Sequence, residues 1–460
     1  MGAGAPLITT VPVAGVALRT LAALHPGRYP VLFDSAAAGP LARFSLLTAA
    51  PRAALWRDAD GVLGASGRTL THDRFLDELE AWIGRESSTQ KGASGKSLPF
   101  TDGWIVYLGY EVAAEIERSL KLPRASTPLS AFALRVDTLA IHDLDHDLVY
   151  AVAPRGASEA HRQLIEDLLA ASASEVEAPR QLPLCKLEEE PATRFIERVF
   201  AAKQHIAAGD IYQANLSRLW RLTLEDPADA AQVYTALRAA NPAPFAARVN
   251  FRGMTILSSS PERLLRIAGR EISTRPIAGT RARLGSAAQD ARETSELVAH
   301  PKERAEHVML IDLERNDLGR VCEAGSVQVD EYMVTESYAH VHHIVSSVRG
   351  RLRADATAVA ALRALFPGGT ITGCPKIRCM QIIAELEGCG RGAYTGSLGW
   401  LGTDGDADFN ILIRTLTMKG HEIELRAGAG IVADSIPERE LAETRAKARG
   451  MLRAFEAPRG

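Results

Sequence analysis

The stretch Pro367-Gly-Gly-Thr-Ile-Thr-Gly-Cys-Pro-Lys376 is the most informative segment of this chain. Two earlier segments belong with it, namely Asp210-Ile-Tyr-Gln-Ala-Asn-Leu-Ser217 and Arg275-Pro-Ile-Ala-Gly-Thr280. Cys374 lies inside the first stretch and is followed by proline, and the chain contains no Gly-x-Cys-x-Gly motif. The stretch is therefore not the nucleophile elbow of an amide-cleaving cysteine enzyme, and the function has to be derived from the residues around it.

The composition is that of a soluble globular protein. Of the 460 residues, 46% are hydrophobic and 24% are charged, which is the usual balance for that class. This length allows two or three domains, or one large α/β body with a smaller partner. The formal net charge of −3 provides no basic footprint for nucleic acid. A small anionic ligand would therefore have to be held by a local cluster of cations.

Several features indicate a cytoplasmic protein that binds no membrane. The N-terminus lacks the basic start of a secretory signal, and Pro6 stands where myristoylation requires a hydroxyl residue. The most apolar early stretch, 11–24, is interrupted by Arg19 and is too short to span a bilayer. An odd number of cysteines without CxxC spacing indicates reduced thiols and no zinc site. These are Cys185, Cys322, Cys374, Cys379 and Cys389.

Two polar stretches indicate a loop and a boundary between regions of the chain. Residues 85–96 indicate a solvated loop, and residues 171–180 indicate a linker ahead of a change in motif density. We therefore divide the chain into an N-terminal region 1–170, a linker 171–190 and a catalytic region 191–456.

The hydrophobic pattern is that of a mixed α/β protein with large antiparallel or mixed sheets. Pro191 opens a helical pattern that ends at Gly209, where a left-handed residue is easily accommodated. Apolar runs bounded by turn residues predict strands. We expect strands over 104–108, 139–142, 254–257 and 411–417, and further helices over 301–313 and 437–455.

Two pairs of glutamates are candidates for metal binding. Glu303 and Glu306 follow Pro301, a residue that suits a helix start, and their spacing places them on one helix face. Glu440 and Glu443 repeat the arrangement. This spacing also describes an ordinary solvated helix face. If both pairs face one cavity, their repulsion requires a cation between them, and hard oxygen donors without cysteine suit Mg²⁺.

The three segments quoted first resemble those of the chorismate-utilising enzymes, which add ammonia or water to one small dicarboxylate. The resemblance covers nearly the full length and is densest from Pro191 onward. It implies an α/β (α+β) chorismate-binding fold with large, mostly antiparallel sheets flanked by helices. Region 1–170 resembles the N-terminal part of anthranilate synthase component I, including the neighbourhood where those enzymes bind tryptophan. For the metal, the resemblance implies Glu306 and Glu443 as direct Mg²⁺ ligands, with Glu303 and Glu440 in supporting positions.

The resemblance also implies the reacting groups. Glu262 follows an apolar strand and would lie on a turn at its end, where it matches the family's general acid. Such a carboxyl has to stay protonated in order to release the C4 hydroxyl of chorismate. Without the resemblance, an N-cap or an ion pair to Arg263 would be the simpler interpretation. His343 and Thr370 match the family's active-site histidine and threonine.

The substrate-binding residues follow in the same way. Glycines in Ala427-Gly-Ala-Gly-Ile-Val-Ala-Asp-Ser435 allow backbone N–H groups to approach an anion closely. By themselves they also describe a tight turn, and the tyrosine and arginine below also describe a half-buried aromatic and an ion-paired strand residue. The residues implied to bind substrate are Tyr394, Arg414 (expected on a strand), Gly428, Gly430, Lys447, Gln213 and Ala278.

The nucleophile is indicated by Gln213. By the resemblance, Gln213 stands at the position where the water-adding relatives carry a lysine that acts as the general base for water. Glutamine cannot deprotonate water. Ammonia is therefore the expected nucleophile. Since the chain has no glutaminase motif, the ammonia implies a separate glutaminase subunit.

The position of amination rests on four local features. Tyr212–Leu216, Val341–Ile344 and Pro367–Gly373 resemble aminodeoxychorismate synthases, which aminate C4 for 4-aminobenzoate and folate synthesis. Ala278 opposes this assignment, because many members of that branch carry a nucleophilic lysine there and a methyl group cannot act as one. The alternatives are anthranilate synthase component I, which aminates C2 and eliminates pyruvate, and a catalytically silent regulatory homologue.

Overall fold

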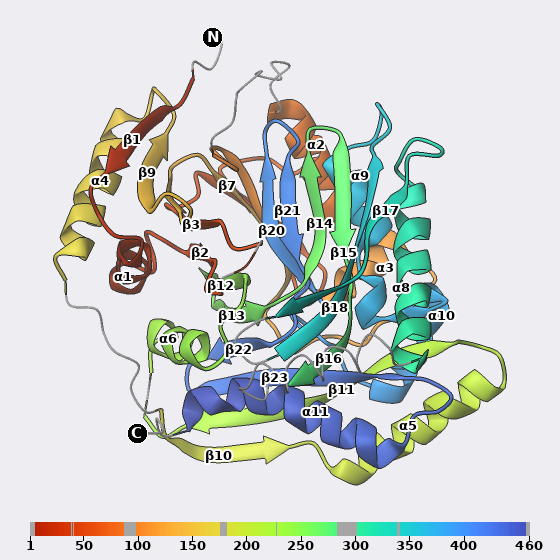
Figure 1. Cartoon of the computed structure of the whole chain (residues 1–460). Coiled ribbons are helices and arrows are strands. Elements are labelled where there is room, and N and C mark those ends of the chain that lie inside the picture. Colours follow the sequence, from red (N-terminus) through yellow and green to blue (C-terminus); the bar gives the residue numbers. More distant parts are fainter. Residues whose placement is uncertain are drawn as a thin grey trace.

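Two large antiparallel sheets pack against each other and carry helices on their outer faces (Figure 1). The computed structural model describes residues 5–37, 39, 41–86, 98–174, 182–226, 228–282, 301–337 and 341–456, and it leaves out the side chains of 278–282, 301–303, 337 and 341–343. The large antiparallel sheets with flanking helices confirm the fold class that the sequence implied.

The first sheet contains 12 strands in the described part of the chain. A long pair near one edge of this sheet, β11 and β23, runs antiparallel from Ala214–Ile431 to Thr223–Glu422. In spatial order the strands are β1 (Leu7–Val11), β9 (Leu148–Ala153), β8 (Leu139–Asp143), β3 (Phe44–Thr48), β2 (Val31–Asp34), β12 (Phe245–Phe251), β13 (Met254–Ser260), β22 (Thr415–Lys419), β23 (Glu422–Ile431), β11 (Gln213–Leu224) and β10 (Leu184–Glu189), with β19 (Gly373–Cys374) paired to β11.

The second sheet contains 11 strands in the described residues. In spatial order they are β16 (Ile277–Ala282), β18 (Val341–Arg351), β15 (Glu271–Arg275), β14 (Arg263–Ala268), β21 (Ala407–Asn410), β20 (Ser397–Gly402), β6 (Gly103–Leu108), β7 (Leu129–Val136), β4 (Ala53–Asp58) and β5 (Leu63–Ser66), with β17 (Gln328–Ser337) paired to β18.

Helices cover the outer faces of both sheets. In Figure 1, α1, α4 and α6 lie on the side of the first sheet, and α8 and α9 lie on the opposite side of the molecule. No described helix is long and apolar enough to cross a bilayer. The helices are α1 (Val16–Leu24), α2 (Phe75–Glu86), α3 (Ala113–Ile116), α4 (Ser158–Ser172), α5 (Ala192–Ala207), α6 (Ala230–Ala240), α8 (Pro301–Gly319), α9 (Ala358–Leu365), α10 (Lys376–Glu387) and α11 (Pro437–Leu452), with short 3₁₀ turns η1 (Tyr110–Val112), η2 (Gly369–Ile371) and η3 (Arg453–Phe455).

The hydrophobic pattern explains the central strands. β6 is buried along its whole length because Trp104 and Val106 pack among the helices while Ile105 and Tyr107 pack between the sheets. A strand buried on both faces is expected to read as a continuous apolar run. The predictions of strands at 104–108, 139–142 and 254–257 are confirmed.

The predicted helices are also present. α5 begins after Pro191 and buries Phe195, Val199 and Ala202, and Gly209 beyond it has φ +79°. α11 with η3 spans 437–455 as expected, whereas α8 extends to Gly319, six residues beyond the predicted end at 313.

The predicted linker 171–190 is only partly irregular. Residues up to Ser172 complete α4, and Leu184–Glu189 form β10, because that short strand pairs with β11 at the edge of the first sheet. Strands from both sides of this segment pair within each sheet, as β2 does with β12 and β6 with β20. The division into regions 1–170 and 191–456 stays a prediction. The predicted loop 85–96 lies outside the described residues from position 87 onward.

Candidate functional site

The candidate site lies where the chain passes twice between the two sheets. β13 of the first sheet continues through Glu262 into β14 of the second, and residues 411–414 make the return crossing from β21 to β22. Hydrogen bonds hold the two crossings side by side. Ile411 N–H donates to the Glu262 carbonyl over 3.0 Å, and Ser259 N–H donates to the Arg414 carbonyl over 3.1 Å.

Glu262 therefore lies on a turn at a strand end, as the sequence predicted, and its side chain is buried. Its Oε1 accepts a hydrogen bond from the Thr370 hydroxyl at 2.9 Å and a longer one from Ile277 N–H at 3.4 Å. Burial raises the pKa of Glu262 to about 7, against the effect of these donors. Arg263 is not its partner, because that guanidinium pairs with Asp408 at 2.9 Å. The site thus holds a carboxyl that can carry a proton near neutral pH.

Arg414 lies in the return crossing and not on a strand. The prediction of a strand over 411–417 was wrong for its first four residues, since β22 begins at Thr415. Arg414 has φ +51°, a left-handed conformation that a regular strand does not contain. The turn is needed because the chain changes sheets here. The positive charge of Arg414 opposes the rise in the pKa of Glu262 that burial causes.

Lys447 reaches the same region from α11. Its ammonium donates to the Gly428 carbonyl at 2.9 Å and lies 2.7 Å from the Glu443 carboxylate. Its charge also lowers the pKa of Glu262. Thr370 thus contacts Glu262 directly, and Arg414 and Lys447, from two further parts of the chain, act on the same carboxyl through their charge.

The two glycines of β23 make room for polar side chains. A Cβ on Gly428 would lie 2.6 Å from the Tyr394 hydroxyl and 2.7 Å from Asn215 Oδ1, and a Cβ on Gly430 would lie 2.5 Å from Gln213 Nε2. Gln213 Oε1 and Asn215 Oδ1 are buried and have no hydrogen-bond partner among the described residues. Burial raises the pKa of Tyr394 to about 12, so its hydroxyl stays a neutral donor. These groups can contact a polar ligand.

Sequence reasoning missed the ion pair beneath these residues. Arg391 donates to the fully buried Glu387 carboxylate at 2.7 Å, and it also donates to the carbonyls of Ile371 (3.2 Å) and Asn215 (2.6 Å). Although burial alone would raise it, the pKa of Glu387 is held below its usual value by Arg391. The guanidinium lies over the Tyr394 ring at 5.6 Å. No helix spacing signals this pair, because α10 ends at Glu387 and Gly388, at φ +63°, turns the chain before Arg391.

The candidate metal ligands lie on two helices. Glu306 is on α8, and Glu440 (7% exposed) and Glu443 are on α11. Among the described side chains, no group of three His, Cys, Asp or Glu residues gathers as a metal site. The side chain of Glu303 lies outside the described part. The contact of Glu443 with Lys447 places this face of α11 beside the site. The donors are hard oxygens, and this donor chemistry fits Mg²⁺.

The backbones at His343 and Ala278 lie in neighbouring strands. His343 is in β18, which pairs with β16 and β17, and Ala278 of β16 pairs with Ile344. Since Ile277 N–H donates to Glu262, position 278 is one residue from a direct contact with the candidate acid. The side chains of both predicted residues lie outside the described part of the structure.

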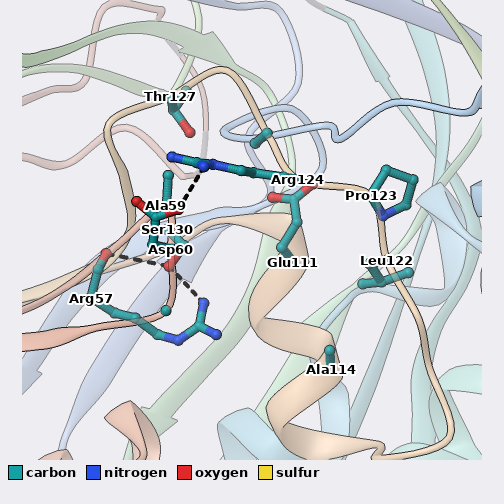
Figure 2. Close-up of a pocket in the computed structure, with 12 residues that line it drawn as sticks. Arg57, Ala59, Asp60, Glu111, Ala114, Leu122, Pro123, Arg124, Thr127 and Ser130 are labelled. Carbon is teal, nitrogen blue, oxygen red and sulfur yellow. Dashed lines mark hydrogen bonds and ion pairs between the residues drawn. The ribbon is translucent and has the colours of Figure 1, made fainter.

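Two cavities are lined by residues of the N-terminal third, and the larger of them is also lined by residues between Pro244 and Asn410. One, of about 370 Å³, is lined by Asp34, Ser35 and Arg43 among others, in the neighbourhood that resembles the tryptophan-binding region. The other, of about 170 Å³, is shown in Figure 2 and includes Arg57 and Glu111 in its wall. Neither of these cavities is lined by Glu262.

Residues 42–453 match the chorismate binding enzyme family. The chain belongs to this family. Aminodeoxychorismate synthase component 1 of Bacillus subtilis is 37% identical over 447 residues, which are 93% of this chain and 92% of that protein. Anthranilate synthase component 1 of Streptomyces coelicolor is 42% identical over 376 residues, or 77% and 73%. The solved structure of anthranilate synthase component I from Streptococcus pneumoniae gives a TM-score of 0.78 at 31% identity, over 90% of this chain and 93% of that one. This protein is therefore an enzyme that acts on chorismate.

The close approach at Gly428 yields a first prediction. In Gly428→Ala the added methyl would meet the Leu216 carbonyl at 2.8 Å in addition to Tyr394 and Asn215, and a backbone atom cannot move away cheaply. We expect this variant to lose about 1–3 kcal/mol of stability by overpacking and most of its affinity for chorismate, measured by calorimetry. Gly84→Ala is the matched control, because nothing lies within 4 Å of its Cβ position in α2. Unchanged binding in Gly428→Ala would contradict the proposed place of the substrate.

The pKa of Glu262 yields a second prediction. Folding raises this pKa from 4.5 to about 7, so the folded state binds the Glu262 proton more tightly than the unfolded state does. The stability that this proton contributes is complete below pH 4.5 and is lost as the pH rises through 7. Glu262→Gln has no charge to bury. We compare the free energy of unfolding of this variant with that of the unsubstituted protein. Between pH 4 and pH 8 this difference should change in favour of the variant by up to about 3 kcal/mol.

Urea unfolding at the two pH values measures this difference. Glu385→Gln on α10, an exposed position, serves as the control and should show no such change. A stability difference for Glu262→Gln that is the same at pH 4 and pH 8 would mean that this carboxyl does not change charge in the range.

Proposed function

We propose that this enzyme is the synthase subunit, component I, of an aminodeoxychorismate synthase. It would replace the C4 hydroxyl of chorismate by an amino group, giving 4-amino-4-deoxychorismate for 4-aminobenzoate and folate synthesis. The observation that supports the proposal is that the three distinguishing segments are linked to Glu262, one by a direct hydrogen bond and two through strand pairing. Segment 367–373 supplies Thr370, its end pairs with 212–216 through β19 and β11, and 341–344 pairs with β16 next to Ile277.

The proposed reaction uses Glu262 as the proton donor. Ammonia adds to the ring, the C4–O bond breaks, and the hydroxyl takes the Glu262 proton and leaves as water. The Thr370 hydroxyl holds the acid in place. A pKa of about 7 leaves a substantial protonated fraction at neutral pH, which an exposed glutamate would not provide.

The two carboxylates of chorismate require fixed positive and hydrogen-bonding groups. Arg414 and Lys447 supply charge near Glu262, and Tyr394 supplies a neutral hydroxyl. The close approach of Gly428 and Gly430 to their neighbours leaves backbone accessible to an anion. His343 is proposed to lie near the enolpyruvyl group. These groups orient the substrate and remove its negative charge from water.

Magnesium is proposed to bind between α8 and α11. Glu306 and Glu443 would be direct ligands, with Glu303 and Glu440 in support. When bound, the ion neutralises a substrate carboxylate and fixes its orientation. The chain itself contributes the carboxylates of these four glutamates. The ammonium of Lys447 pairs with Glu443 and offsets part of the repulsion between the carboxylates.

Ammonia is proposed to come from a separate glutaminase subunit. Gln213 lies in the site at the start of β11, and its amide cannot act as a base for water. Amination is therefore favoured over hydration at this position.

A second candidate function is anthranilate synthesis. It is favoured by Ala278, which lies one residue from the contact between Ile277 and Glu262 and cannot attack the ring. In the C4 reaction ammonia itself, or another group, must then make the first addition. The alternative of a catalytically silent homologue is opposed by Glu262, Thr370, Arg414 and Lys447, which supply an acid, its hydrogen-bond donor and two cations.

Product analysis separates these functions. The purified protein is incubated with chorismate, Mg²⁺ and an ammonium salt. We expect no fluorescent anthranilate, and we expect 4-aminobenzoate only after an aminodeoxychorismate lyase is added. Direct appearance of anthranilate would establish the second function, and consumption of no chorismate would favour the silent homologue.

Magnesium dependence tests the proposed ligands. Glu440→Gln removes a carboxylate charge from the buried face of α11, so the Mg²⁺ concentration for half-maximal activity should rise at least about tenfold. Glu438→Gln is the matched control, because this residue is exposed in the first turn of the same helix. The same Mg²⁺ requirement in both variants would remove Glu440 from the metal site.

A further inference from the structure

We propose that Glu111, in the N-terminal third of the chain, is a positioning residue for the substrate-binding segment around Tyr394. Its Oε1 accepts a hydrogen bond from Arg391 N–H at 2.6 Å, and both carboxylate oxygens lie 3.2 Å from Gly392 N–H. One side chain thereby satisfies two successive backbone donors, only two residues before Tyr394. The role rests on the proposed contact of Tyr394 with substrate.

The backbone at this point is shaped to receive an anion. Gly392 has φ +60°, a left-handed conformation, and consecutive N–H groups around such a residue form a concave nest that binds negative charge. The Glu111 carboxylate occupies this nest, and Tyr110 N–H donates to the Gly392 carbonyl at 2.9 Å. The segment is therefore held by both the side chain and the backbone of η1.

Arg391 carries the constraint further into the site. Besides its bond to Glu387, its guanidinium binds the Ile371 carbonyl, next to the Thr370 that holds Glu262. It also stacks over the rings of Tyr110 at 5.0 Å and Tyr394 at 5.6 Å. Glu387 thus holds the Arg391 guanidinium against the turn that carries Thr370, whereas Glu111 holds the backbone of the segment that carries Tyr394.

The outer side of Glu111 faces a surface cavity. Figure 2 shows Glu111 in the wall of the 170 Å³ cavity with Arg124, whose own carbonyl accepts the Gly390 N–H at 3.3 Å. A Cβ on Gly392 would lie 3.0 Å from the Thr127 methyl. The loop that lines the cavity therefore packs against the same 390–392 segment and leaves it little freedom to shift.

Glu111→Gln tests this role. Glutamine has one acceptor oxygen in place of two, and its NH₂ group would face an N–H donor of the nest. We expect the KM for chorismate to rise about tenfold with kcat changed less than about twofold, since the loss of a charge-assisted hydrogen bond moves the substrate contact and not the acid. The readout is the disappearance of chorismate, which does not depend on the product. Glu117→Gln is the matched control, because the hydrogen bonds of that carboxylate within the described part of the chain come from Ser119.

A double-mutant cycle with Tyr394→Phe separates positioning from a general effect on the fold. We expect Glu111→Gln to have a much smaller effect on KM in the Tyr394→Phe background. Additive effects, or an unchanged KM in Glu111→Gln, would overturn the positioning role alone. If Tyr394→Phe itself leaves KM unchanged, the proposed substrate contact fails and the inference fails with it. Should Glu111→Gln not fold, Gly392→Ala disturbs the nest from the other side and should show the same rise in KM.

Discussion

The burial of the Glu262 carboxyl between two crossing segments is the constraint on which the site depends. Removing a carboxylate from water is unfavourable, so the fold tolerates this side chain mainly by allowing it to hold a proton. The crossings cannot move apart to let water in, because each donates a backbone hydrogen bond to the other. The Thr370 bond then fixes the direction of the carboxyl. The same feature that weakens the folded state therefore provides a proton donor at neutral pH.

The surroundings of two buried glutamates in this site shift their pKa values in opposite directions. The hydrogen bonds that Glu262 accepts from described residues come from neutral donors, Thr370 and Ile277 N–H, and burial raises its pKa to about 7. Glu387 contacts Arg391 and accepts hydrogen bonds from both the N–H and the hydroxyl of Ser217, and its pKa is lowered in spite of burial. Different environments for identical side chains commonly separate an acid from a structural anion. Glu387 stays charged and holds Arg391 in place, whereas Glu262 can release and take up a proton near neutral pH.

Hydrophobic periodicity and turn residues predicted those helices and strands whose burial follows from their own local sequence. The two-sided apolar run of β6, the amphipathic α5 and the strand-end position of Glu262 could all be derived from periodicity and turn residues. Arg414 could not, because Ile411-Leu-Ile-Arg has the composition of a strand, and only the change of sheet forces its left-handed turn. The nest that binds Glu111 joins residues about 280 positions apart, and no periodicity in one segment reports a partner so distant.

The N-terminal third is consequently part of the catalytic structure. β6 covers the edge of β20, and β2 covers the edge of β12, along four to six residues of antiparallel pairing each. Without them the catalytic strands would expose unpaired N–H and C=O groups, which favour association with other chains. The family match begins at residue 42, well inside this third. Since Glu111 also holds the segment before Tyr394, the geometry of the site requires both parts of the chain to fold together, even though the site residues predicted from sequence all lie beyond residue 191.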